Sequence, residues 1–352
     1  MNELLKTLVE LPGACAHEHA VIRFLSEYLD GKVDEWHVDG LGNLIVKKQG
    51  GLPGPTLMVS AHSDEVGFIV KKIEKNGLLR FEKLGGNDDR TLLSELVNVV
   101  TDNGLVPGVI GNISAHMRRF DDQSLIRSYL KLYIDIGVHS KEEAEELGVK
   151  VGDPICWATK YQEIGKNMAL GHAFDDRAGC YCLVRLLTET DFSRVRGTVY
   201  GIFSVQEELG LRGAETAANE LHADVALAVD TTACSDTFEG MMDDTMALGK
   251  GPGVKIMDMS LAADVHVHKK LAKLCEENDI PWQPEVFTGI GTDAGALHRS
   301  HGGVPSSVIS IPSRYAHSSC ELIDLNDLEY CVQLLKLFVC SMTDRSEFAF
   351  LQ

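Results

Sequence analysis

The chain of 352 residues is 44% hydrophobic and 24% charged, which is ordinary for a globular protein, and it is too long for one small core. Its formal net charge of -19, from 52 acidic against 33 basic residues, argues against nucleic acid as a partner, because phosphate binding needs clusters of Lys and Arg. The charge suits an enzyme that binds cations or amines, although an acidic solvated surface without function explains it equally well.

The N-terminal segment is amphipathic, with helical periodicity over residues 3–10 and 18–29. Its start lacks the basic region, the apolar core and the small-residue cleavage site of a signal peptide. No apolar run approaches the roughly 20 residues that a membrane helix needs. The nine cysteines are odd in number and form no C-x-x-C pair. We therefore expect a reducing, cytoplasmic location without a membrane partner.

Strands follow this helical segment. Residues 33–48 are typical of two short strands around a Gly-Leu-Gly turn. Residues 56–62 form an apolar run of strand length, bounded upstream by Gly and Pro. Buried strands of parallel sheets have this near-continuous apolar character, so we expect a buried strand here.

The pattern changes between residues 66 and 162, where alternating segments are separated by turn residues. Residues 128–137 alternate as in a strand, and one short helix is predicted to begin after Ser140. We expect a mostly antiparallel, β-rich, barrel-like domain over 66–162 that is inserted into the other domain. The other domain is then discontinuous and consists of 1–65 and 163–352.

Helices and strands alternate again after this insertion. The predicted helices cover 176–188, 213–221, 265–278 and 327–342, and the predicted strands cover 198–205, 223–230 and 304–312. This order predicts an α/β fold with a mixed, largely parallel sheet flanked by helices on both faces.

Polar residues with metal-binding side chains stand where the predicted strands end. In chain order they are His62 with Asp64, Asp175 with Asp176, Glu207 with Glu208, Asp230, and His317. Each alone has an ordinary alternative, such as a polar turn, a helix N-cap, a solvated acidic loop or a structural histidine. Ligands of such sheets bind at the carboxyl ends of the strands, so the agreement among these positions favours one common site.

Two histidines and three carboxylates suit a pair of divalent ions. We predict Asp175 as the bridging ligand, with His62 and Asp230 on one ion and Glu208 and His317 on the other. Two ions roughly 3.5–4 Å apart lower the pKa of a shared water and polarise a carbonyl oxygen. We expect zinc in this site, with cobalt and manganese as alternatives, because all three accept this ligand set.

Two further acids have other predicted roles. Two carboxylates that leave a strand side by side repel unless a positive charge neutralises them. With Glu208 as a ligand, Glu207 stays free to take a proton from water and to deliver it to a leaving amine. Asp64 is placed to orient the ring of His62. The residues therefore predict hydrolysis of an amide.

The sequence resembles the M42 family of metallo-aminopeptidases, which includes tetrahedral, glutamyl and FrvX-like aminopeptidases and proteins once called endoglucanases. The resemblance covers nearly the whole chain, through AHSDEVGFIV, FDDRAGC, QEELGLRGA, AVDTT, GTDAGALH and RYAHSSCE in this order. It implies the same five metal ligands, with Glu207 as the base and Asp64 as the partner of His62.

The resemblance has further implications for the protein. It implies an aminopeptidase that acts on peptides with a free N-terminus, and a cis peptide bond between Asp175 and Asp176. It also implies that the domain over 66–162 forms dimers, which assemble into a tetrahedral dodecamer.

Three alternatives to an aminopeptidase remain. A deacylase or a dipeptide hydrolase on the same scaffold would differ in its dependence on a free amine. A glycosidase is disfavoured, because carboxylates saturated with metal leave no free acid pair. A non-catalytic metal-binding assembly protein would be expected to have lost Glu207 or a ligand, and all are present.

Residues in and near the GTDAGALH motif are further candidates for a substrate pocket. Gly291, Thr292 and Asp293 are candidates for shaping it through close approach of the backbone. His298 and His301 are candidates for lining it, against the more common role of a structural histidine. The sequence leaves the preferred N-terminal residue of the substrate open.

Overall fold

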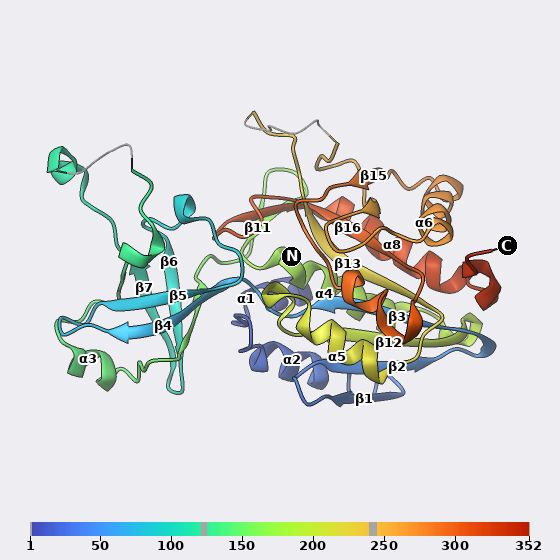
Figure 1. Cartoon of the computed structure of the whole chain (residues 1–352), viewed down its shortest axis with the longest axis horizontal. Coiled ribbons are helices and arrows are strands. Elements are labelled where there is room, and N and C mark those ends of the chain that lie inside the picture. The colour runs from blue at the N-terminus through green and yellow to red at the C-terminus, as the bar shows by residue number, and fades with distance from the viewer. Residues whose placement is uncertain (1, 121–124, 239–244, 352) are drawn as a thin grey trace.

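The computed structural model describes residues 2–120, 125–238 and 245–351. It consists of an α/β body and a β-barrel that projects from one side of it (Figure 1). The fold class predicted from the sequence is confirmed: helices flank a mixed sheet, and the closed barrel is inserted in the chain between two strands of that sheet, Leu52–His62 and Gln162–Ile164. The exact limits predicted for the two domains stay a prediction.

The sheet of the body has the spatial order β1-β2-β12-β3-β13-β16-β17-β11-β10, with β14 paired to β16 and β15 paired to β14. The strands are β1 (Glu35–Val38), β2 (Leu44–Gln49), β3 (Leu52–His62), β10 (Gln162–Ile164), β11 (Met168–Gly171), β12 (Arg196–Ser204), β13 (Val225–Ala233), β14 (Gly253–Met257), β15 (Gln283–Val286), β16 (Ser306–Arg314) and β17 (Glu321–Asp324). Strand β3 is parallel to β12 and β13, and β13 is parallel to β16. The carboxyl ends of these four strands therefore lie at one edge of the sheet.

Helices cover both faces of this sheet. The core on one face contains residues of α1 (Glu3–Glu10), α2 (His19–Leu29), α4 (Phe174–Glu189), α6 (Val265–Glu277) and α8 (Leu325–Ser341). The core on the other face contains residues of α5 (Arg212–Glu220) and α7 (Ala294–Leu297). Residues 57–62 of β3 are all buried, which explains the near-continuous apolar run in this segment.

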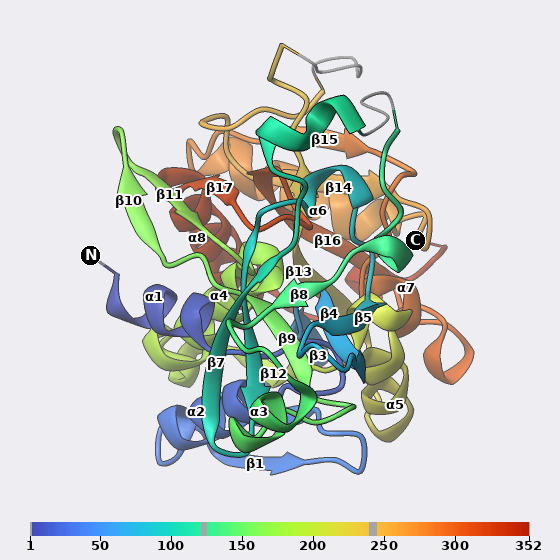
Figure 2. The ribbon, with the colours of Figure 1, turned by 90° about the vertical axis from the view of Figure 1, so that its left-hand side faces the viewer.

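The barrel closes in the order β4-β5-β8-β7-β6-β9 and lies in front of the body in Figure 2. Its strands are β4 (Gly67–Ile73), β5 (Leu79–Leu84), β6 (Leu96–Thr101), β7 (Gly104–Ile110), β8 (Ile134–Asp135) and β9 (Pro154–Trp157), with α3 (Lys141–Glu146) before β9. The ring of Phe68 meets those of Phe81 and Trp157 edge to face, at centroid distances of 5.0 and 5.1 Å. These aromatic rings belong to a hydrophobic cluster separate from those of the body.

Two parts of the predicted secondary structure differ from the observed one. The strand expected over 128–137 is only Ile134–Asp135, because the side chain of Ser128 accepts a hydrogen bond from the backbone N–H of Leu130 and starts a 3-10 turn. Leu130 is consequently 60% exposed instead of facing the core. Strands β10, β11, β14, β15 and β17 and the short helix α7 were not predicted. None of the helices in the described parts of the chain combines the length and hydrophobicity that crossing a membrane requires.

Candidate metal centre

The side chains that the sequence singled out meet at the carboxyl edge of the sheet. His62 is the last residue of β3, Glu207 and Glu208 open a 3-10 helix three residues after β12, and His317 follows β16 by three residues. Asp175 lies in the first turn of α4. The chain therefore brings together residues up to 255 positions apart, counted from His62 to His317 (317 − 62).

Asp230 is an exception to the expectation that every candidate ends a strand. Strand β13 continues for three residues beyond it, to Ala233, since its pairing with β16 extends that far. The pairing of β13 with β3 ends earlier, at Ala228 opposite Ser60. Asp230 thus lies beyond the ladder with β3, close to His62.

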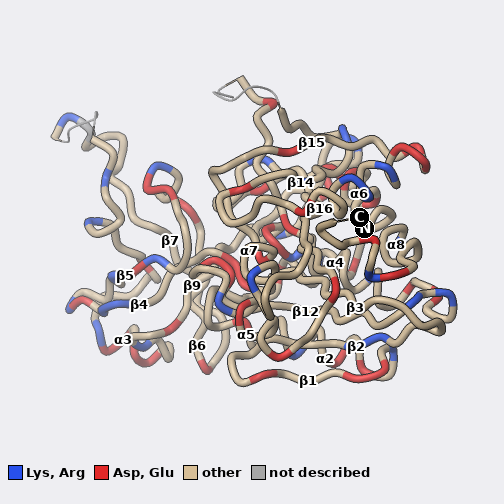
Figure 3. Tube along the Cα trace, turned by 45° about the vertical axis from the view of Figure 1, so that its right-hand side comes forward, with Lys and Arg blue, Asp and Glu red and all other residues tan. Residues whose placement is uncertain are grey.

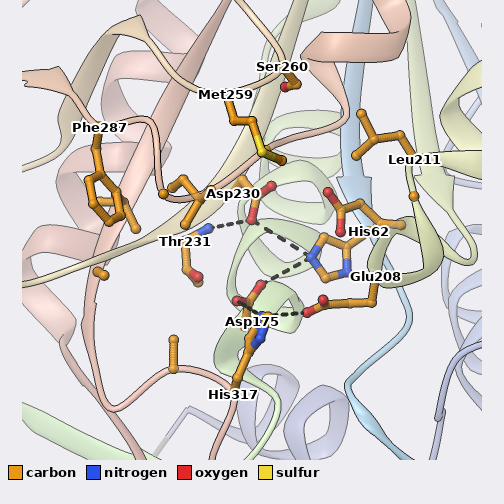
Figure 4. A pocket seen from close by; sticks show the side chains of 18 residues that line it. His62, Asp175, Glu208, Leu211, Asp230, Thr231, Met259, Ser260, Phe287 and His317 are labelled. Carbon is orange, nitrogen blue, oxygen red and sulfur yellow. Dashed lines mark hydrogen bonds and ion pairs between the residues drawn. The ribbon is translucent and has the colours of Figure 1, made fainter. Parts of the chain in front are cut away.

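The five predicted ligands form two groups that share Asp175 (Figure 4). In the first group, Nε2 of His62 lies 3.1 Å from Oδ1 of Asp175 and 3.8 Å from Oδ1 of Asp230. In the second, Nε2 of His317 lies 2.8 Å from Oε1 of Glu208 and 3.4 Å from Oδ2 of Asp175. Asp175 thus presents one carboxylate oxygen to each histidine, which is the arrangement expected of a bridging ligand.

Both histidines are oriented by the same kind of contact. Nδ1 of His62 lies 3.2 Å from the carbonyl oxygen of Asp64, and Nδ1 of His317 lies 2.7 Å from the carbonyl oxygen of Gly86. A carbonyl only accepts hydrogen bonds, so each Nδ1 carries a proton and each Nε2 faces the carboxylates. This tautomer leaves Nε2 as the ligand atom in both rings. Gly86 follows β5, so the barrel supplies the acceptor for His317.

The carboxylate of Asp64 holds the backbone next to the candidate ligands. It accepts hydrogen bonds from the backbone N–H groups of Glu207, at 3.0 Å, and Glu208, at 3.1 Å. Its Oδ1 also lies 3.4 Å from Nδ1 of His62. Asp64 is completely buried, so this one carboxylate fixes the backbone of the Glu pair and contacts a candidate ligand.

Glu321 also accepts hydrogen bonds from backbone groups of the site, as Asp64 does. The sequence did not indicate this role. The Glu321 carboxylate accepts hydrogen bonds from the backbone N–H of Asp175 and from that of His317, both at 3.0 Å. Glu321 is 2% exposed and begins β17. It stands in the RYAHSSCE segment, but its role depends on backbone contacts that only the folded chain defines.

Asp176 completes the start of α4. One oxygen accepts a hydrogen bond from the backbone N–H of His62 at 3.1 Å, and the other from Gly179 at 2.9 Å. The peptide bond between Asp175 and Asp176 is cis, as the family resemblance implied. Asp176 therefore links β3 to the helix that carries the shared carboxylate.

The electrostatics of the group are dominated by excess negative charge (Figure 3 shows several acidic stretches of chain near the junction of body and barrel). Burial raises the pKa of Glu207 and that of Asp230 well above their usual range, and neighbouring carboxylates add to both shifts. Burial alone would lower the pKa of His317, but its hydrogen bonds to Asp175 and Glu208 raise it to about 12. Such buried carboxylates stay ionised only when a cation compensates their charge.

The donor set is suited to divalent ions. Neutral imidazole nitrogens and carboxylate oxygens are ligands of zinc, cobalt and manganese, and a bound ion would take the place of the ring protons on Nε2. Each of the two groups has ligand atoms within 4.8 Å of one another. A third such group contains His62, Glu207 and Glu208, so geometry alone leaves Glu207 open to either role, ligand or base.

A cavity of about 480 Å³ opens over the group. Gly291 lines it as expected, whereas Thr292 and Asp293 are buried and do not. His298 and His301 do not line it either: Nδ1 of His298 contacts the carbonyl oxygen of Ala294, and His301 stacks on His222. The histidines of this segment therefore have structural contacts instead of a pocket role.

The fold and the site together define a candidate metal-dependent enzyme of the α/β class. Comparison with known proteins identifies the family. The model of the family described as M42 glutamyl aminopeptidase matches residues 42–334, and the chain belongs to this family of aminopeptidases, as its motifs predicted.

Individual relatives align with this chain over almost their full length. A putative aminopeptidase of Acetivibrio thermocellus is 36% identical over 340 residues, which cover 97% of this chain and 98% of that protein. The structure of an aminopeptidase from the archaeon Desulfurococcus kamchatkensis has a TM-score of 0.93 at 35% identity, covering 99% of this chain and 98% of its own. The TET1 peptidase of Pyrococcus horikoshii, which can assemble into a tetrahedron or a large octahedral shell, has a TM-score of 0.86 at 34% identity, with coverages of 97% and 99%.

Proposed function

We propose that the protein is a co-catalytic di-metal aminopeptidase that removes N-terminal residues from peptides with a free N-terminus. The observation that carries this proposal is the position of Asp175, which offers one oxygen to the His62 group and the other to the His317 group. The five ligands are those predicted from the sequence, and zinc is the expected metal, with cobalt and manganese as alternatives.

The chain's own residues have distinct parts in this reaction. When bound, two divalent ions would polarise the scissile carbonyl and lower the pKa of a water. Glu207 takes the proton from that water and delivers it to the amine that leaves. Its backbone is held by Asp64 and its side chain is 8% exposed at the cavity, so the carboxylate is presented to the reacting atoms from a fixed position.

The role of Glu207 is tested by Glu207→Gln, which keeps the shape of the side chain and removes its basicity. We expect turnover of an aminoacyl amide to fall by about 10²–10⁴-fold, since this is the range that general acid–base catalysis contributes. Elemental analysis should still find two metal ions per chain. The control is Glu215→Gln, an exposed glutamate of α5, which should behave like the parent.

Three outcomes would overturn parts of this proposal. Loss of one metal ion from Glu207→Gln would make Glu207 a ligand, as the third group of donors allows. Faster cleavage of N-acylated peptides than of free peptides would favour a deacylase, because an aminopeptidase requires the free amine. Near-parental turnover by the variant would remove Glu207 from the mechanism.

We further propose that the barrel carries a dimer contact and that dimers assemble into a tetrahedral dodecamer. The support is the likeness to the TET1 peptidase, which can assemble into a tetrahedron or a large octahedral shell, and the surface of the barrel. Large apolar side chains of the barrel region are exposed there: Leu96, Leu105, Ile113, Met117, Phe120, Leu125, Ile126 and Leu130. Burial of these apolar side chains between two copies would remove them from water, which favours association.

A further inference from the structure

The cavity over the candidate metal centre has one charged side and one apolar side. Figure 4 shows Leu211, Met259 and Phe287 around the acidic group, on the side away from His317. Ile290 also lines the cavity, and the lining between these side chains is small or neutral, as with Ala233 and Gly291. The four large apolar residues form what we call the apolar wall.

Among the described residues, the apolar wall offers no charged partner to a substrate side chain. Among the described lining residues, the ionisable ones are those of the candidate metal centre with Glu207. Behind the wall, Lys255 is completely buried, with Nζ 2.9 Å from Oε1 of Glu285. That same oxygen accepts a hydrogen bond from the hydroxyl of Thr232 at 2.6 Å, and neither member of the ion pair lines the cavity.

The wall is held in place by a buried carboxylate. Asp258 accepts hydrogen bonds from the backbone N–H groups of Ser260 and Leu261, both at 2.7 Å, and from the hydroxyl of Thr292 at 3.1 Å. The backbone N–H of Met259 donates to the carbonyl oxygen of Ile290 at 2.9 Å. The loop that carries Met259 is therefore fixed by hydrogen bonds on both sides.

Met259 has apolar surface that the folded chain does not cover. Its side chain is 72% exposed although its backbone is fixed, and it points to the cavity. An apolar substrate side chain would bury this surface. A Lys or Glu side chain in the same place would lose water without gaining an ionic partner.

We infer that the protein selects peptides whose N-terminal residue has a large apolar side chain, of the size of Leu, Met or Phe, over those that begin with Lys or Glu. This inference rests on the proposed aminopeptidase function. It concerns which substrates the site takes, and the wall of Leu211, Met259, Phe287 and Ile290 carries it.

The test is a panel of aminoacyl p-nitroanilides of Leu, Met, Phe, Lys and Glu, assayed with the metal-loaded protein. We expect kcat/KM for the apolar members to exceed that for the Lys and Glu members by at least about tenfold, which is the discrimination that a hydrophobic pocket provides. A Lys or Glu substrate that is cleaved as well as the Leu substrate would overturn the inference while leaving the aminopeptidase function intact.

Absence of turnover with every member would instead count against the proposed function. The preference is then decided by binding, with hydroxamates of leucine, lysine and glutamate as probes in a calorimetric titration of the metal-loaded protein. Tighter binding of the leucine compound supports the apolar wall, and equal or weaker binding contradicts it.

The variant Met259→Lys tests the wall itself. A lysine there should raise kcat/KM for the Glu substrate relative to the Leu substrate by about tenfold, because it supplies the missing partner. The matched control is Met257→Lys, two residues earlier, which is 43% exposed but does not line the cavity. The control should keep the parental preference; a shift of equal size in both variants would mean that net charge, and not the wall, sets the selectivity.

Discussion

The α/β body and the barrel differ in where they place their polar and apolar residues. The body buries apolar residues on both faces of its sheet and concentrates carboxylates at one edge. The barrel has its own core around Phe68 and Trp157 and exposes apolar residues, such as Phe120 and Leu130, on its surface. The body also exposes apolar residues, such as Met259, so the clearer difference is that the five candidate metal ligands all belong to the body. This difference is in line with the proposal that the metal centre lies in the body and a dimer contact on the barrel.

The largest expected effect concerns the surface of the barrel. In the parent protein, Leu105 is 50% exposed and Leu130 is 60% exposed. The double variant Leu105→Glu with Leu130→Glu replaces these two apolar side chains by charged ones. Like charges at a contact between two copies repel and lose water, so we expect the assembly to dissociate into small species. Multi-angle light scattering measures the mass directly.

The control for this variant lies in the body, where Leu41 is 38% exposed. Leu41→Glu should leave the mass of the assembly unchanged. Equal masses for the parent and the barrel variant would place the contact elsewhere and remove the proposed role of the barrel.

The core of the barrel provides the next test. Phe68→Ala removes a completely buried ring that contacts Phe81 and Trp157, and such a change costs about 3–5 kcal/mol. Because the two regions have separate cores, we expect faster hydrogen exchange in β4–β9 and near-parental exchange in the strands of the body. The matched variant Phe203→Ala in β12 should show the reverse. If hydrogen exchange became equally faster in the body and the barrel in either variant, the two regions would unfold as one unit.

The smallest expected effect concerns Glu321 in the body. Glu321→Gln replaces one of the two oxygens that hold Asp175 and His317 by an NH₂ group, which does not accept their backbone N–H. We expect metal affinity to fall by about 10–100-fold, the usual cost of losing a partner that orients a ligand. Competition with a chelator measures this affinity, and circular dichroism shows whether the fold is kept.

The control for Glu321 is Glu276→Gln, an exposed glutamate of α6. It should bind metal as the parent does. Unchanged affinity in Glu321→Gln would reduce that residue to a structural contact.

Much of the body was predictable because its signals are local. The run at 56–62 is apolar since β3 is buried on both faces, and the helices over 3–10 and 18–29 are amphipathic since one side packs on the core. His62, Glu207 and His317 could be singled out because the carboxyl ends of parallel strands share an edge. Their convergence is observed, whereas their roles as ligands or base stay predictions.

The residue roles that the sequence did not indicate depend on contacts between distant segments of the chain. Glu321 acts on the backbone of a residue 146 positions away, which no spacing in the sequence indicates. The apolar wall combines residues of separate loops, such as Leu211 and Phe287, whose exposure depends on the packing around them. His301 was considered for the pocket from its closeness in sequence, but its ring instead lies on His222.

The hydrogen bond from His317 to the carbonyl of Gly86 limits how far the two regions can be treated as modules. A chain shortened by replacing 66–162 with a brief linker would keep the body's sheet and the residues at its edge, yet its second histidine would lose the acceptor that fixes its tautomer. Excision, domain exchange or fusion at this insertion is therefore expected to alter the candidate metal centre even if the body folded unaided. The two regions have separate hydrophobic cores, but both contribute contacts to the candidate metal centre.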